Sequence, residues 1–344
     1  MAGSLSARVH GGLSHGGGGS PKVDLSVNIN PYGPCEPVLR AVSQAHLDRY
    51  PDPAARDARR AWALALATRE ECIAVAHGAT DLLWAIVAAR TRRGGRVLIA
   101  EPTFSELRIA AEAAGAEIVP VWARQASGFA WDMDQLKRAL SGVALAYLCS
   151  PNNPTGVYTS LAQIRELAAS APTTWIVVDQ SFLSLSDHAV DAVADLPDNV
   201  LALRSLTKDY ALPGLRIGLL WAHPEVVAQI EAARPSWSTS ACAQAAIVAS
   251  ASARAFVSES WQRLRSARSR TATLLARHGL RVLPTSTAFH LVEVGDARGF
   301  QRRLLQGGVL VRDCTSFGLS GHIRIAACPE AKQHALHEAL ACLG

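Results

Sequence analysis

Lys208 stands in the stretch "SLTKDYALPGLRIG" and is one of only four lysines among the 34 lysines and arginines of the chain. A lysine amine can lose its proton and form a Schiff base with a carbonyl, whereas arginine keeps its charge at any workable pH. Ser205, Thr207 and Arg216 flank it, and small hydroxyls with a guanidinium are typical of a phosphate site. The stretch therefore predicts a nucleophilic amine beside a phosphate. The alternative is an ordinary surface lysine.

A second candidate for chemistry is Asp179, which ends the apolar run "WIVVD". A buried carboxylate needs a cationic or hydrogen-bonded partner. A carboxylate that holds a ring nitrogen protonated would turn a pyridinium ring into an electron sink. The alternative is that Asp179 caps the segment that follows it.

Three further motifs suit a flat phosphorylated ring. In "HGATD", Gly78, Ala79 and Thr80 stand at a predicted helix start, where free N–H groups favour phosphate, although any helix N-terminus looks similar. "SPNNPTG" is a rigid turn that could present the Asn153 amide to a ring oxygen. Phe104 in "EPTF" could stack on the ring or belong to the core. Together these motifs predict pyridoxal 5'-phosphate as the cofactor.

These motifs follow apolar runs that alternate with helical patterns. The runs are "CIAVAHGAT", "RVLIAEPTF", "AEIVPVW", "VALAYLCS", "TTWIVVDQ" and "NVLALRS". They predict an α/β fold with a mostly parallel sheet covered on both faces, whose ligand lies at the carboxyl ends of the strands. Later runs, "HLVEVG", "VLVRDC" and "HIRIAA", predict a smaller α+β domain. We expect an N-terminal, substrate-contacting segment over 1–40, a large domain over 41–235 and a small domain over 236–344.

Composition narrows the class of protein. The 344 residues are 49% hydrophobic and 18% charged, which is typical of a globular protein, and no apolar run is long enough to span a bilayer. The first twenty residues lack the apolar core of a secretory signal, and the seven cysteines are scattered without a CxxC pair. We expect a cytoplasmic protein with reduced thiols and no metal site. The net charge of +5 is modest, and no basic run predicts nucleic-acid binding.

The order GATD, PTF, NNPTG, D-x-x-F, S-x-T-K and R-x-G resembles the fold-type I pyridoxal-phosphate enzymes of the aminotransferase class I/II group, over essentially the whole chain. The resemblance implies an aspartate-aminotransferase-like fold. It implies Lys208 and Asp179 as catalytic residues, the first in a Schiff base and the second under the pyridine nitrogen. Phe104 would stack on the ring and Asn153 would bind its hydroxyl. The residues implied to hold the phosphate are Gly78, Ala79, Thr80, Ser205, Thr207 and Arg216.

The resemblance also reaches beyond the cofactor. Tyr50, in "RYPD", is similar to a tyrosine that reaches the cofactor phosphate of the neighbouring subunit, which implies a homodimer with shared active sites. Arg324, in "HIRIA", resembles an arginine that binds a substrate carboxylate. The residues expected to bind an amino acid or amino-acid phosphate are His10, Asn30, Arg312 and Arg324.

The ends of the chain resemble threonine-phosphate decarboxylases of the cobalamin pathway, which are close to histidinol-phosphate aminotransferases. "HGG" at 10–12, "LSVNINPYGP" at 25–34 and "VLVRDCTSFGL" at 309–319 carry this similarity, and Phe182 agrees with it, because many aminotransferases have tyrosine there. Two departures are the Gly-rich stretch after His10 and Gln180, which replaces a common glutamate. We expect a decarboxylase, with an aminotransferase as the alternative.

Two other classes fit the sequence less well. "SLTK" matches the S-x-x-K of penicillin-binding enzymes, but their S-D-N and K-T-G motifs are missing from the sequence. A cofactor-binding sensor or scaffold would need no complete set of cofactor positions, and here each of them is filled.

Overall fold

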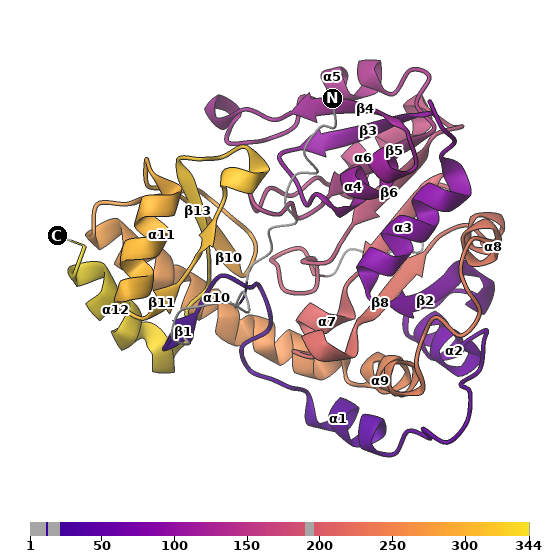
Figure 1. Ribbon diagram of the computed structural model, residues 1–344, viewed down its shortest axis with the longest axis horizontal. Coiled ribbons are helices and arrows are strands. Elements are labelled where there is room, and N and C mark those ends of the chain that lie inside the picture. The colour runs from indigo at the N-terminus through magenta and orange to yellow at the C-terminus, as the bar shows by residue number, and fades with distance from the viewer. Residues whose placement is uncertain (1–11, 13–20, 190–195, 344) are drawn as a thin grey trace. The chain divides into compact units, whose positions relative to one another are not determined.

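The computed structural model describes residue 12 and residues 21–189 and 196–343, and these residues form two compact units (Figure 1). The large unit comprises Ile29–Asn153 and Val157–Trp261, and the small unit comprises Pro154–Gly156, the chain from Gln262 onward and the described residues up to Asn28. The predicted division after residue 235 differs from this one. The reason is that a helix beyond 235, α9 (Ala241–Ser252), packs on two helices of the large unit, α1 (Glu36–Ser43) and α2 (Arg56–Ala65).

A seven-stranded sheet with the order β2-β8-β7-β6-β5-β3-β4 forms the centre of the large unit. Every neighbouring pair is parallel except the two pairs that involve β8. The sheet is therefore mostly parallel, as the sequence predicts, but β8 was not predicted. The strands are β2 (Ile73–His77), β3 (Arg96–Glu101), β4 (Glu117–Trp122), β5 (Leu145–Cys149), β6 (Trp175–Asp179), β7 (Val200–Arg204) and β8 (Ile217–Trp221).

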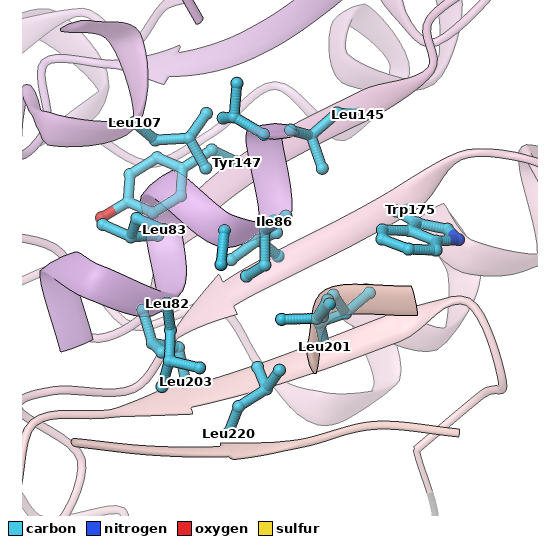
Figure 2. Close-up of a cluster of buried hydrophobic side chains, with 14 of the residues drawn as sticks. Leu82, Leu83, Ile86, Leu107, Leu145, Tyr147, Trp175, Leu201, Leu203 and Leu220 are labelled. Carbon is cyan, nitrogen blue, oxygen red and sulfur yellow. The ribbon is translucent and has the colours of Figure 1, made fainter. Parts of the chain in front are cut away.

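Helices cover this sheet because its central strands are apolar on both faces. Figure 2 shows one packed face, where Leu83 and Ile86 of a helix meet Leu145 and Tyr147 of β5 and Leu201 of β7. That helix is α3, which is apolar on almost every side and is therefore buried along most of its length. Helix α3 spans Ala79–Arg90, and the unit also contains α4 (Glu106–Ala113), α5 (Met133–Ala139), α6 (Leu161–Ser170), α7 (Leu206–Asp209) and α8 (Pro224–Ala232).

The small unit contains an antiparallel sheet with the order β12-β13-β10-β9 and a separate parallel pair, β1 with β11. The run "VLVRDC", predicted as one strand, is divided here, because its first half pairs with β1 and its second half with β13. The strands are β1 (Val23–Asp24), β9 (Arg281–Val282), β10 (Phe289–Glu293), β11 (Val309–Leu310), β12 (Arg312–Asp313) and β13 (His322–Ala326). The helices are α11 (Ala297–Gln306) and α12 (Gln333–Ala341), with α10 (Arg254–Arg277) crossing the boundary at residue 262.

Short 3-10 helices complete the chain at η1 (Glu70–Cys72), η2 (Gln125–Ser127), η3 (Pro213–Leu215), η4 (Thr315–Phe317) and η5 (Glu330–Lys332). Within the described ranges, no single helix is long and apolar enough to cross a membrane, and α9 with α10 reaches the required length and composition only as a pair bent by 71°. The cytoplasmic location stays a prediction.

Candidate active site

The predicted cofactor residues of the large unit gather at the carboxyl edge of the parallel strands, apart from Tyr50. Strands β5, β6 and β7 end there, and β8 begins there because it runs in the opposite direction. The connection from β7 to β8 therefore leaves this edge and returns to it. This connection contains Ser205, Thr207, Lys208 and Arg216. One short segment therefore places an amine, two hydroxyls and a guanidinium at the same edge of the sheet.

The carboxylate of Asp179 is buried and is held at both of its oxygens. Tyr147, from the neighbouring strand β5, donates its hydroxyl hydrogen to Oδ2 at 2.9 Å, and the Ser181 N–H donates to Oδ1 at 2.9 Å. Burial, reinforced by the Asp179 charge, raises the pKa of Tyr147 far above its ordinary value, so the phenol keeps its proton and acts as a donor. The chain's own groups thus orient Asp179.

The Lys208 residue is half-buried, and its Nζ lies 5.1 Å from the centre of the Phe182 ring. Burial lowers its pKa, and the negative charge of Asp179 only partly opposes this effect. The amine therefore loses its proton more readily than an exposed lysine does, as a nucleophile must.

Asn30 forms hydrogen bonds with backbone carbonyls of the short helix α7. Its backbone N–H donates to the Lys208 carbonyl at 3.0 Å and its side-chain Nδ2 donates to the Asp209 carbonyl at 2.9 Å. Its Oδ1 accepts from the Tyr32 N–H at 3.1 Å. The side chain that was predicted to bind substrate is thus engaged with backbone around Lys208, and its role toward substrate stays a prediction.

Backbone of two segments approaches closely at the start of α3. Gly78 has φ +86°, a conformation that favours glycine, and a Cβ there would lie 2.9 Å from Nη2 of Arg216. A Cβ on Gly218 in β8 would lie 2.4 Å from the Ala79 nitrogen. Glycine at both positions lets the guanidinium and β8 approach the helix N-terminus, with its free N–H groups.

The hydroxyls complete this anion cradle. The Ser205 Oγ and Thr207 Oγ1 atoms are buried and lie 2.7 Å apart at the start of α7. Thr80 lies in the first turn of α3. A helix N-terminus, two hydroxyls and a guanidinium match the donors that a phosphate requires, so the residues present fit the phosphate of the predicted cofactor.

The loops after β3 and β5 are joined by hydrogen bonds. Thr103 donates its hydroxyl hydrogen to Asn152 Oδ1 at 2.9 Å, and Asn152 Nδ2 donates to the Pro102 carbonyl at 2.8 Å. These bonds fix the half-buried Phe104 and the buried Asn153, which follow directly. An aromatic ring and an amide at this edge fit a flat, hydroxylated ring.

Tyr50 is 81% exposed and contacts Trp237, with ring centroids 5.1 Å apart. It lies at the surface of the large unit. Its contact with the cofactor of a neighbouring subunit stays a prediction.

The two predicted arginines of the small unit face each other across β12 and β13. Arg312 and Arg324 are paired in register and buried. Arg324 donates to the Ser26 carbonyl at 2.6 Å and Arg312 to the Ser316 hydroxyl at 2.7 Å. Burial, with the charge of Arg312 adding to it, lowers the pKa of Arg324 to about 10. His10 lies outside the described residues.

Sequence reasoning missed Tyr147 and Asp209, and it quoted Gly218 in the R-x-G motif without foreseeing its close approach to Ala79. A tyrosine in the apolar run "VALAYLCS" and an acid directly after Lys208 were visible signals. Their partners are far away in sequence, which hid their role. The described residues of the large unit thus bring together an amine, an oriented carboxylate and an anion cradle.

The chain matches the family described as "Aminotransferase class I and II" over residues 20–343. It is 31% identical to the histidinol-phosphate aminotransferase of Symbiobacterium thermophilum, over 94% of this chain and 91% of that protein. It is 32% identical to the enzyme of the same name from Halorubrum lacusprofundi, over 94% and 90%. The solved histidinol-phosphate aminotransferase from Sinorhizobium meliloti, in complex with pyridoxal-5'-phosphate, is 25% identical with a TM-score of 0.85, covering 94% of this chain and 92% of that one.

Fold and site together define a fold-type I pyridoxal-phosphate enzyme with the aspartate-aminotransferase-like architecture. The chain belongs to the class I and II aminotransferase family. The predicted fold, group and cofactor are thereby confirmed. The names of these relatives favour the aminotransferase, which was the alternative, over the predicted decarboxylase.

Proposed function

We propose that this chain transfers the amino group of a phosphorylated amine, of the histidinol-phosphate type, to a 2-oxo acid. The observation that carries the proposal is its similarity, over 94% of its length, to proteins named histidinol-phosphate aminotransferase. Histidinol phosphate has a free amine and a phosphate. In this proposal the cofactor held at Lys208 would accept the amine, and the buried guanidiniums of Arg312 and Arg324 would bind the phosphate.

In this proposal the large unit provides the chemistry. When bound, pyridoxal phosphate supplies a carbonyl for amines and a ring that takes up the electrons of a broken Cα bond. Lys208 would hold the cofactor covalently, and its Nζ would move the Cα proton of the substrate. Asp179, oriented by Tyr147, would hold the proton on the ring nitrogen of the bound cofactor.

The remaining large-unit residues bind and orient the cofactor. Phe104 would stack on the ring and Asn153 would bind its hydroxyl. The phosphate is held by the anion cradle, whose residues are Gly78, Ala79, Thr80, Ser205, Thr207 and Arg216. Tyr50 reaches the phosphate site of a second subunit, so the working form in this proposal is a homodimer.

Arg312 and Arg324 hold the anionic groups of the substrate in this proposal. The two buried guanidiniums lie opposite each other in register, burial and the charge of Arg312 lower the pKa of Arg324, and a bound phosphate or carboxylate would offset the repulsion between the two charges. His10 and Asn30 are the further proposed contacts. The same arginines would receive the carboxylates of the 2-oxo acid in the second half of the reaction.

A second candidate is decarboxylation of an amino-acid phosphate such as threonine phosphate. The specific observation that favours it is the ring of Phe182, which lies against the Lys208 amine without the hydroxyl that a tyrosine would offer. The bond that breaks is the one aligned with the ring's π system, so the grip of the arginines on the substrate decides between the two reactions.

One experiment separates the two candidates. Purified full-length chain is offered histidinol phosphate, threonine phosphate and several amino acids, each with and without 2-oxoglutarate. We expect glutamate to form from histidinol phosphate in the presence of 2-oxoglutarate. Release of CO2 from threonine phosphate without any oxo acid, and no glutamate, would replace the aminotransferase with the decarboxylase.

The covalent role of Lys208 has its own test. Borohydride treatment of the cofactor-loaded protein should fix the cofactor on the peptide that contains Lys208, as mass spectrometry would show. Lys208→Ala should abolish this adduct, whereas the control Lys137→Ala, which changes a lysine paired with Glu166, should retain it. An adduct that persists in Lys208→Ala would contradict the assignment.

A further inference from the structure

Arg234 carries a buried guanidinium that the proposed reaction does not use. Only 4% of its side chain is exposed, and it lies just after the end of α8, where α3, α8 and β2 pack against one another (Figure 1). A buried guanidinium loses its hydration, and only hydrogen bonds and opposite charges can offset that loss. The partners of Arg234 therefore indicate what the group does in the large unit.

The guanidinium of Arg234 joins four parts of the large unit through hydrogen bonds. Nη1 donates to the Val75 carbonyl of β2 at 3.0 Å and to Glu231 Oε1 of α8 at 2.9 Å. Nη2 donates to Asp81 Oδ2 of α3 at 3.0 Å and to the Ser238 hydroxyl at 2.9 Å. Because a guanidinium is a rigid planar fork, these bonds fix the two acids relative to the strand.

Asp81, one of these acids, belongs to the same turn as the anion cradle. It is the third residue of α3 and directly follows the cradle residues Ala79 and Thr80. Its Oδ2 atom also accepts a hydrogen bond from the backbone N–H of His77 at 3.3 Å, and His77 directly precedes Gly78. The carboxylate thus reaches back along the turn whose free N–H groups are proposed to bind the phosphate.

A carboxylate without a partner at this position would weaken the binding of phosphate. A phosphate monoester carries about 1.5 to 2 negative charges at neutral pH, and a like charge nearby raises its free energy. The Asp81 carboxylate is paired with Arg234 at 3.0 Å, and arginine keeps its charge at any workable pH. Glu231 pairs with the other terminal nitrogen of the guanidinium and belongs to α8 rather than to the cradle.

We propose that Arg234 is a positioning residue that neutralises Asp81 and holds its carboxylate at the His77 backbone, so that the first turn of α3 accepts the phosphate of the cofactor. Arg216 belongs to the cradle itself, whereas Arg234 acts on the phosphate only through Asp81. This inference rests on the proposed anion cradle and extends it to a residue that is not part of it.

The test compares two ligands that differ in the phosphate group. Full-length chain freed of its cofactor is titrated with pyridoxal phosphate and with pyridoxal, and absorbance gives both dissociation constants. The affinity for pyridoxal phosphate divided by that for pyridoxal is the phosphate ratio, which isolates the contribution of the phosphate. The variants are Arg234→Met, Asp81→Asn, the double variant with both changes, and Arg216→Met as a reference for the cradle. The control is Glu231→Gln, which changes the other acid bound by the same guanidinium.

In Arg234→Met we expect the phosphate ratio to fall roughly five- to twentyfold, because Asp81 keeps its charge and loses its partner. Asp81→Asn should raise the ratio roughly two- to fivefold, since a negative charge beside the cradle is lost. The double variant should return to within about threefold of wild type, because neither charge remains. Glu231→Gln should change the ratio by less than about twofold. High salt should reduce the deficit of Arg234→Met, since salt screens charges.

A phosphate ratio in Arg234→Met equal to that of wild type would overturn the proposal, and so would a double variant that stays as low as Arg234→Met. A purely structural role would lower both affinities together and leave the ratio unchanged. If circular dichroism shows that Arg234→Met is unfolded, Asp81→Asn decides, and a ratio equal to wild type would overturn the proposal.

Two observations separate this failure from failure of the proposals on which it rests. A ratio that falls in Arg216→Met but not in Arg234→Met leaves the cradle intact and rejects only the role of Arg234. Because binding is measured without substrate, a wrong reaction would appear as missing glutamate while the phosphate ratios still behave as expected.

Discussion

Asp209→Asn should stabilise the folded chain in a manner that depends on pH. Burial raises the pKa of Asp209 from 3.8 to about 6 on folding, so the folded state holds this proton more tightly than the unfolded state does. Below about pH 4 the carboxyl is largely protonated in both states, so its ionisation does not lower the free energy of unfolding. As the pH rises toward 6, the unfolded state ionises first and the free energy of unfolding falls.

The size of the effect follows from the same two values. Each pH unit between them is worth roughly 1.4 kcal/mol, so the folded chain loses about 3 kcal/mol by the time the pH exceeds 6. An amide has the same shape and no charge. The variant should therefore match wild type near pH 4 and exceed its stability by roughly 1 to 3 kcal/mol at pH 7, with the lower values reflecting an amide group that lacks a full set of partners.

Urea unfolding of the cofactor-free chains, followed by circular dichroism at several pH values, measures this difference. The slope against urea should stay the same, so the midpoint alone reports stability. Asp198→Asn, which changes an exposed carboxylate, should stay within about 0.5 kcal/mol of wild type throughout. A stability difference for Asp209→Asn that does not vary with pH, or a loss of stability at pH 7, would refute this reasoning.

Other substitutions test the rest of the site. Tyr147→Phe removes one of the two donors to Asp179 and should cost about 1.5 to 3 kcal/mol of interaction, seen as a roughly tenfold or greater fall in kcat with little change in KM; an unaltered kcat would show that Asp179 needs no such support. Gly218→Ala would press a methyl group onto the Ala79 nitrogen and should lower stability by about 1 to 3 kcal/mol and weaken cofactor binding, as thermal melts with and without cofactor would show; equal melting with and without the substitution contradicts the packing. Arg324→Lys should reduce kcat/KM about tenfold to a hundredfold while the cofactor absorbance is retained, and loss of that absorbance would argue for a structural role instead.

The mostly parallel sheet of the large unit could be predicted because buried parallel strands are nearly continuous apolar runs in the sequence. Apolar runs gave β5, β6 and β7, and polar residues after each run marked the edge where Asp179 and Lys208 lie. Strand β8 was missed. Its sequence, "IGLLW", is short and follows a loop of turn residues. No local pattern in the sequence indicates that this strand runs antiparallel to β7.

The contacts that refine the site could not be predicted, because each depends on register or on distant segments. Tyr147 reaches Asp179 only because β5 and β6 pair with Cys149 opposite Asp179. Arg234 and Asp81, which form an ion pair, are 153 residues apart in the sequence. The contacts of Asn30 with the lysine turn likewise join segments that are 179 residues apart, which no local pattern reveals.

The division of labour between the two units has a consequence for how such a chain can diverge. The residues proposed to hold the cofactor all belong to the large unit, whereas Arg312 and Arg324 belong to the small unit. Mutations that reshape β12, β13 and their loops can change which anionic compound is accepted without disturbing the amine, the carboxylate or the anion cradle. If the arginines bind substrate as proposed, substitutions confined to the small unit would be enough to give the same cofactor chemistry a new substrate.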